Sequence, residues 1–326
     1  MKTQLGKWVT ILVASFLGIA LFVESGGADE ADKFPSRPIT YISMTTAGGP
    51  LDLQARLICK EAEKYLKQPV VVLNKPGGGG TIATATLAAA KPDGYTVGTV
   101  GHSAIYSAPF LEKLVYQPLK DLRPIMQFAM YNFGIIVKAD SQFKTFKDIV
   151  EYARQNPKKL TFGTNGANTL QTVITMQLAK KEKVDFIPIP FKGTGEWQSA
   201  LLGGHVQFSV GDFNYSLVDA GQVRVMLLLR EERSPDFPGV PILKDLGYNY
   251  ICPMANMVFT QKAVPDGVVR KLEDAFTKAM KEPGFIKGMK ELHADIVYRN
   301  EKESIDFFRK TYEFYGKIIK EMDIKR

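Results

Sequence analysis

Short β-rich runs alternate with helical stretches along this chain, and the alternation begins twice. The first series contains two helices and three strands: a helix ending near 67 and another over 81–90, with strands at 37–42, 69–73 and 95–100. The second series repeats the pattern, with helices over 170–181 and 196–202 and strands at 160–163, 185–190 and 206–210. Strands that alternate with helices form parallel, doubly wound sheets. The sequence therefore predicts an α/β protein with two Rossmann-like lobes.

The C-terminal part of the chain is predicted to return to the first lobe. It contains one strand and two helices, at 257–260, 265–281 and 301–322. Asn300 and Glu303 have the spacing of a capping box at the start of the last helix. The expected boundaries are 33–130 and 257–326 for the first lobe and 131–256 for the second. Two lobes joined by more than one crossing enclose a cleft and form a hinge.

The N-terminus has the pattern of a secretory signal peptide. Lys2 and Lys7 flank the start of an apolar run, Trp8 to Val23, and small residues follow at 26–28. The run is roughly 16 residues long, shorter than the ~20 that a membrane-spanning helix needs, so a cleaved signal over 1–28 is favoured over a permanent anchor. We therefore expect an exported, soluble protein.

Net charge and cysteine content restrict the function further. The formal charge of +8 falls to +7 without the signal peptide, which carries Lys2, Lys7 and Glu24. There is no basic block and no aromatic ladder, so nucleic acid is not an expected partner. Cys59 falls on the apolar face of its helix and is predicted to be buried. Whether it pairs with Cys252 stays open, since an exported protein can form disulfides.

The motifs of several enzyme and cofactor classes are missing. The glycines at 48–49 and 77–80 fit neither the P-loop nor the dinucleotide fingerprint, and no Gly-x-Ser-x-Gly motif occurs. None of the three histidines has zinc-site spacing. His102 follows the third strand and could line the cleft, but an isolated surface histidine is the favoured interpretation. We therefore expect no catalytic residues, no metal and no cofactor.

Hydrogen-bond donors gather instead on three loops that follow predicted strands. Hydroxyl, amide and backbone N–H groups that converge from two lobes suit a carboxylate. The candidate ligand-binding residues are Thr45, Thr46, Ala47, Gly48, Gly49, Thr164, Asn165, Gly166, Asn168, Thr169, Lys192 and Gly193. Thr and Asn also cap helices, and this simpler role is compatible with anion binding at the same helix start.

Asp52 is a carboxylate close to the first of these loops. It would repel an anionic ligand if it faced the cleft, whereas it would stabilise the first helical turn if it accepted hydrogen bonds from backbone amides there. We therefore predict that Asp52 caps the loop and the helix.

Seven motifs occur in the order typical of one protein family. They are Phe34 to Ile39, Gly48-Gly49-Pro50-Leu51-Asp52 with Ala55-Arg56, Asn74 to Gly80, Pro92 to Thr96, Pro190 to Gly193, Leu202 to Val206, and Arg233 to Pro241. With this series the chain resembles the periplasmic solute receptors of tripartite tricarboxylate transporters, the Bug or TctC-like family. The resemblance covers essentially all of the chain after the signal peptide.

The resemblance implies a monomeric periplasmic receptor with the Venus flytrap architecture of periplasmic binding proteins. Such a receptor binds a carboxylate between the loops 45–49 and 164–169 and delivers it to membrane permease subunits. The chain departs from the family at Met44-Thr45, Asn168 and Thr172, so the distal part of the ligand is not specified. An exported sensor for a membrane signalling partner and, less favoured, an exported enzyme on the same scaffold are the alternatives.

Overall fold

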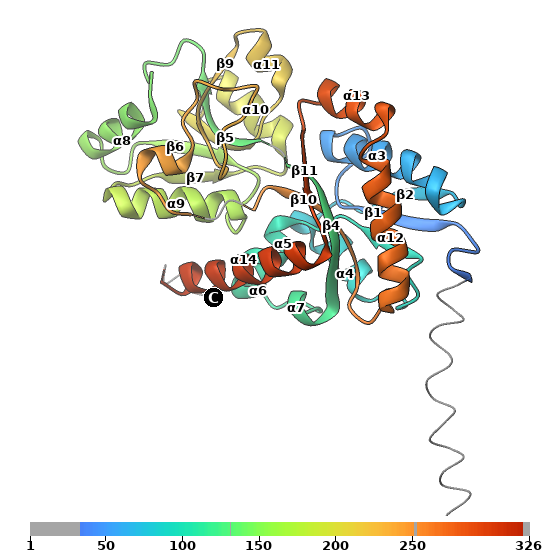
Figure 1. Cartoon of the computed structure of the whole chain (residues 1–326). Helices are drawn as coiled ribbons and strands as arrows, with labels where there is room; N and C mark the ends of the chain where they lie inside the picture. Colours follow the sequence, from blue (N-terminus) through green and yellow to red (C-terminus); the bar gives the residue numbers. More distant parts are fainter. Residues whose placement is uncertain (1–32, 131, 251–252, 322–326) are drawn as a thin grey trace, which may run out of the picture.

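The computed structural model describes residues 33–130, 132–250 and 253–321. The predicted signal peptide, 1–28, and Cys252 therefore lie outside the described residues. Within them the chain forms two mixed sheets covered by helices (Figure 1), so the predicted α/β class is confirmed. None of the helices in this part of the chain has the length and apolar character needed to cross a membrane.

The first sheet has six described strands in the order β11-β4-β10-β3-β1-β2. Their bounds are β1 (Ile39–Ser43), β2 (Val70–Asn74), β3 (Thr96–Gly98), β4 (Leu122–Met130), β10 (Ala255–Gln261) and β11 (Asp295–Arg299). β1 is parallel to both β2 and β3, as the alternating pattern predicts. β10 and β11 pair antiparallel to β4, and neither β4 nor β11 was predicted from the sequence.

The second sheet has five described strands in the order β7-β6-β8-β5-β9. Their bounds are β5 (Phe133–Lys138), β6 (Thr161–Thr164), β7 (Ile187–Pro190), β8 (Phe208–Asp212) and β9 (Val223–Leu228). β6 is parallel to β7 and β8, as predicted, whereas β5 pairs antiparallel with β8 and β9. We call the two sheets with their helices the first and second lobes.

Six of the described helices match the predicted ones closely. They are α3 (Pro50–Leu66), α4 (Thr81–Ala88), α9 (Leu170–Glu182), α10 (Thr194–Leu202), α12 (Asp266–Ala279) and α14 (Glu301–Glu321). The other helices were not predicted: α5 (His102–Tyr106), α6 (Ala108–Leu111), α7 (Pro118–Asp121), α8 (Phe146–Gln155), α11 (Tyr215–Asp219), α13 (Pro283–Glu291), and the 3-10 turns η1 (Gly78–Gly80) and η2 (Leu243–Leu246).

Helices cover both faces of the first sheet. Successive residues of a strand point to opposite faces, so one strand contributes side chains to the core on each side. Met257 and Phe259 of β10 pack in the cluster that contains α4, α5 and α14, whereas Val258 packs with α3, α12 and α13. Cys59 of α3 is buried in the latter cluster as a free thiol, which confirms its predicted position in the core.

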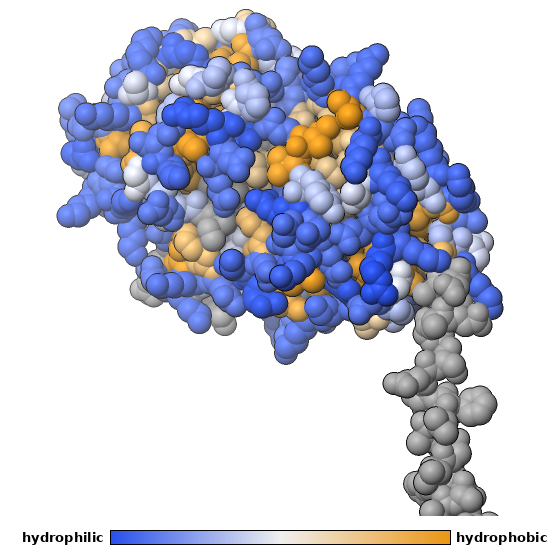
Figure 2. Space-filling model, in the orientation of Figure 1, coloured by the Kyte–Doolittle hydropathy of each residue, from blue (hydrophilic) through white to orange (hydrophobic). Residues whose placement is uncertain are grey.

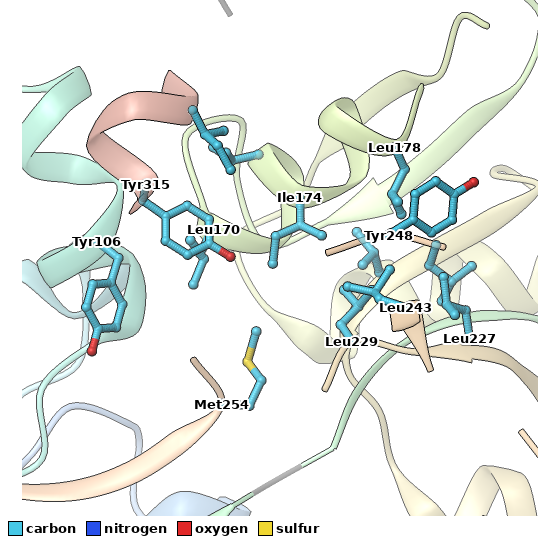
Figure 3. Packing of buried hydrophobic residues seen from close by; sticks show 14 of the residues in the cluster. Tyr106, Leu170, Ile174, Leu178, Leu227, Leu229, Leu243, Tyr248, Met254 and Tyr315 are labelled. Atoms are coloured by element: carbon cyan, nitrogen blue, oxygen red, sulfur yellow. The ribbon is translucent and has the colours of Figure 1, made fainter. Parts of the chain in front are cut away.

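One hydrophobic core extends across both lobes. Figure 3 shows Tyr106 and Tyr315 of the first lobe beside Leu170 and Ile174 of α9, and these residues belong to one buried cluster. α14 runs out along α9 (Figure 1), where Lys180 Nζ donates to the Glu321 carbonyl at 2.7 Å. The flank formed by α9 and α14 therefore joins the lobes through apolar contacts.

The capping box predicted at the start of α14 is present. The Asn300 side chain accepts from the Glu303 amide at 2.9 Å, and the Glu303 carboxylate accepts from the Asn300 amide at 3.0 Å. Both bonds satisfy amides that lack helical partners.

Replacing Asn300 with Ala should lower the free energy of unfolding by about 1 kcal/mol, because the Glu303 amide loses its acceptor. Lys310→Ala, at an exposed position of the same helix, is the control and should change it by less than about 0.5 kcal/mol. Urea unfolding followed by circular dichroism measures both variants. Equal stability of the two would show that the box contributes nothing.

Candidate functional site

A cavity of about 780 Å³ lies between the lobes, and a smaller one of about 280 Å³ adjoins it. Six residues line both: Thr45, Leu51, Lys192, Gly193, Thr194 and Asp212. Because these residues come from both lobes and are shared, we treat the two cavities as one space and call it the interlobe cleft. Figure 2 shows apolar residues beside α13 at the boundary between the lobes, on an otherwise largely hydrophilic surface.

Two helices begin at the interlobe cleft, one from each lobe. α3 starts after Gly49 and α10 after Gly193, and neither N-terminus has a side-chain cap. The residues around both starts line the larger cavity. The first amides of a helix lack internal partners and carry the positive end of the helix dipole. In α3 the first residue, Pro50, has no N–H, so the donors of this helix begin with the Leu51 amide. This arrangement offers hydrogen-bond donors to an anion from two opposite walls.

Asp52 holds the loop before α3 from behind. Its Oδ2 accepts from the Gly48 amide at 2.9 Å and from Arg56 Nε at 2.8 Å, and its Oδ1 accepts from Asn74 at 2.7 Å. Asn74 Nδ2 also donates to the Thr45 carbonyl at 2.9 Å. Asp52 is fully buried and does not line the cleft. Its carboxylate therefore binds the loop backbone, and the Gly48 amide is already used.

The surroundings of Asp52 favour its ionised form. Burial alone would raise the pKa of this carboxyl, but hydrogen bonds from Arg56, Asn74 and the Gly48 amide outweigh burial and lower the pKa below its ordinary value. The loop is therefore fixed by a charged group over the whole neutral pH range.

The structure brings seven of the twelve candidate residues to the interlobe cleft. They are Thr45, Thr46, Gly49, Asn165, Thr169, Lys192 and Gly193. Five others, Ala47, Gly48, Thr164, Gly166 and Asn168, lie next to them in the same loops but outside the lining. The Thr164 hydroxyl is fully buried and lies 2.7 Å from that of Thr172. Thr164 therefore supports the loop 164–169, which we call the second-lobe loop, from the protein interior.

The second-lobe loop is also tied to the first lobe. Ser103 Oγ accepts from the Leu170 amide at 3.1 Å, and Ser107 Oγ donates to the Asn168 carbonyl at 3.0 Å. The first amide of α9 is thus occupied by a side chain from the opposite lobe. Of the second-lobe helices that begin near the cleft, α10 has the more accessible N-terminus.

His102 lies at the smaller cavity and not on the open surface that the sequence favoured. Its Nε2 is 2.8 Å from the Ala255 carbonyl, so this nitrogen carries the proton. Burial lowers the pKa of His102 to about 4, although the carbonyl partly opposes the shift. The ring is therefore neutral at neutral pH and supplies no charge for an anion.

Sequence reasoning missed Asp212, which ends β8 and lines both cavities. Its Oδ1 accepts from Thr194 Oγ1 at 2.7 Å and from Asn165 Nδ2 at 3.3 Å. Burial raises the pKa of Asp212 above its ordinary value, and hydrogen bonds from Thr194, Asn165 and the residue's own backbone amide only partly oppose the shift. The rule that ligands bind beyond the carboxyl ends of strands could have identified this position.

Aromatic residues close one side of the larger cavity. Tyr215 of α11 stacks on His293 of the first lobe with ring centroids 4.4 Å apart, and its hydroxyl donates to the His293 carbonyl at 3.0 Å. Nearby, Arg230 forms an ion pair with Asp295 across the lobes at 2.7 Å. The lobes therefore touch on this rim through polar and aromatic groups.

Comparison with known proteins identifies the family. The family model for the tripartite tricarboxylate transporter family receptor, TctC, matches residues 54–324. A UPF0065 protein in the gbd 5′ region of Cupriavidus necator is 38% identical over 299 residues, which cover 91% of each chain. The chain belongs to the TctC receptor family. The resemblance found in the sequence motifs is thereby confirmed.

Two solved structures share the fold. The periplasmic binding protein BugD is 26% identical, with a TM-score of 0.76, and the match covers 90% of this chain and 99% of BugD. MatC from Rhodopseudomonas palustris, solved with bound malate, is 25% identical with a TM-score of 0.74, covering 88% and 100%. These matches confirm the predicted periplasmic-binding-protein architecture. TctC proteins form a receptor family and not an enzyme family.

Asp52→Asn should destabilise the protein by about 2 kcal/mol at pH 7, because the carboxylate loses its charge-assisted hydrogen bonds. The stabilisation exists above the unfolded-state pKa of about 3.9 and disappears as the pH falls through the lower folded-state pKa. Denaturant unfolding between pH 7 and 3 measures the difference. Asp306→Asn, exposed on α14, serves as control, and an Asp52 variant as stable as this control would refute the assignment.

Asp212→Asn should have the opposite effect on stability in the absence of ligand. An acid with a raised folded-state pKa loses stability as the pH rises above about 3.9, so the neutral variant should melt higher at pH 7 and converge with wild type near pH 4. Each kcal/mol corresponds to roughly 2 °C in a chain of this size. Asp219→Asn, an exposed acid of the same cavity, should show no such gain.

Proposed function

We propose that this protein captures a small molecule with a carboxylate group in the interlobe cleft and delivers it to the membrane permease of a tripartite tricarboxylate transporter. The observation that carries the proposal is the convergence of two uncapped helix N-termini, those of α3 and α10, from opposite lobes on one cavity. Membership of the TctC family and the malate bound to MatC support a carboxylate as the ligand.

Donors from both lobes would bind the carboxylate. Thr45 and Thr46 provide hydroxyl groups at the start of α3, and Gly193 and Thr194 provide backbone amides at the start of α10. Lys192 lines both cavities and adds a positive charge. Each charge-assisted hydrogen bond of this kind contributes about 1.5–3 kcal/mol.

Because residues of both lobes would bind the ligand, ligand binding favours the closed arrangement of the lobes over an open one. A receptor of this kind would act as a monomer in the periplasm, because the described cleft is complete within one chain. Receptors of this family belong to tripartite tricarboxylate transporters, and the lobe surfaces beside the cleft would carry the contact with permease subunits.

A thermal-shift screen of mono-, di- and tricarboxylates tests the proposal. A ligand that binds only the folded protein, at 100 times its dissociation constant, adds about 2.7 kcal/mol of stability, so the cognate acid should raise the melting temperature clearly. A panel without any shift, together with turnover of one of the compounds, would refute the receptor function.

Thr45→Val should then weaken binding of the acid roughly ten- to a hundredfold in calorimetric titration, because it removes a hydroxyl donor at nearly constant shape. Thr86→Val is the matched control, since Thr86 is on α4 away from the cleft and its hydroxyl donates to the Ile82 carbonyl. Equal affinities of the two variants would exclude Thr45 from the site.

A further inference from the structure

The orientation of the Asp212 carboxylate follows from a chain of hydrogen bonds. The indole N–H of Trp197 can only donate, and it lies 2.6 Å from Asn165 Oδ1. The amide group of Asn165 therefore turns its NH₂ toward Asp212, where it donates to Oδ1 at 3.3 Å. Thr194 Oγ1 donates to the same oxygen at 2.7 Å. Both donors act on Oδ1.

The second carboxylate oxygen, Oδ2, accepts from no side chain of the described residues. The one further donor to this carboxyl is the neutral backbone amide of Asp212 itself, and none of the described cations forms an ion pair with Asp212. The residue lines both cavities, so a ligand can reach it. A largely buried carboxylate without a positive partner costs stability. A bound cation would remove this cost.

Asp212 is also adjacent to the place proposed for the ligand carboxylate. Thr194 is the first residue of α10, and its side chain donates to Asp212. One residue therefore contributes to both the anion-binding helix start and the acceptor site. Two ligand groups of opposite charge, separated by only a few bonds, would match this spacing.

The other charged residues of the larger cavity also favour a positively charged group on the ligand. Besides Asp212 its lining contains the acids Asp219 and Glu291, whereas Lys192 is its one Lys or Arg among the described residues. A second carboxylate on the ligand would meet this acidic part of the cavity and be repelled.

We propose that the cognate ligand carries a protonated amino group beside its carboxylate, as α-amino acids do, and that Asp212 Oδ2 accepts a hydrogen bond from this group. The inference rests on the proposed capture of a carboxylate in the same cleft. It adds that the receptor selects amino acids over the corresponding acids without an amino group.

Calorimetric titration of the purified protein with matched compounds tests this selection. Each amino acid of a panel is compared with the acid that lacks the amino group and the amine that lacks the carboxylate, for example phenylalanine with hydrocinnamate and phenethylamine. The amino acid that binds should do so roughly ten- to a hundredfold more tightly than its deaminated acid. Asp212→Asn should abolish this difference, whereas Asp219→Asn should preserve it. Thermal melts verify that both variants fold.

The other possible outcomes distinguish a failure of the amino-group selection from a failure of the proposed carboxylate receptor. If deaminated acids or dicarboxylates bind as tightly as amino acids and Asp212→Asn does not weaken binding, the amino-group selection is wrong and the carboxylate receptor stands. If the free amine binds as well as the amino acid, the carboxylate site is wrong. If no compound in the panel binds, both proposals fail.

Discussion

The loop before α3 can present donors to the cleft because a buried carboxylate holds it from the other side. Asp52 fixes the Gly48 amide, and Asn74 links Asp52 to the Thr45 carbonyl. The ion pair with Arg56 keeps the acid charged although it is fully buried. Without these bonds a short glycine-containing loop would have many conformations, and ordering them would cost part of the binding energy. Preorganisation of the first-lobe wall therefore depends on this one side chain.

Two aspartates near the cleft show how surroundings assign different roles to the same chemical group. Asp52 has three donors, one of which is the cation Arg56, and its pKa is lowered. Asp212 accepts from two side chains on one oxygen and from its own backbone amide, it has no ion-pair partner among the described residues, and its pKa is raised. The first arrangement is complete without a ligand, whereas the second leaves a carboxylate that lines the cleft without a positive partner among the described residues. Such an uncompensated group is typical of a binding site, where stability is sacrificed for recognition.

Local patterns in the sequence were sufficient for the parallel part of each sheet and for the loops at 45–49 and 192–193. They were insufficient for β4 and β11, because those strands are stabilised by antiparallel pairing with each other, and in β4's case also with β10, from distant parts of the chain. Asp212 was missed because the predicted strand ended two residues too early, at 210. The contact of Tyr215 with His293 joins residues 78 positions apart, so no local pattern could reveal it. The exact boundaries of the two lobes, 33–130 with 257–326 and 131–256, stay a prediction.

The two flanks of the cleft differ in the free energy needed to separate the lobes there. On one flank, α9 and α14 share buried apolar side chains such as Ile174 and Tyr315, and parting them would expose surface at about 25 cal/mol per Å². On the other, Tyr215 meets His293 through a ring contact and one hydrogen bond, and Arg230 forms an ion pair with Asp295. Water can replace these polar contacts when the groups part. An opening motion that follows these costs would pivot about the α9–α14 flank and part the lobes at the rim of Tyr215 and His293.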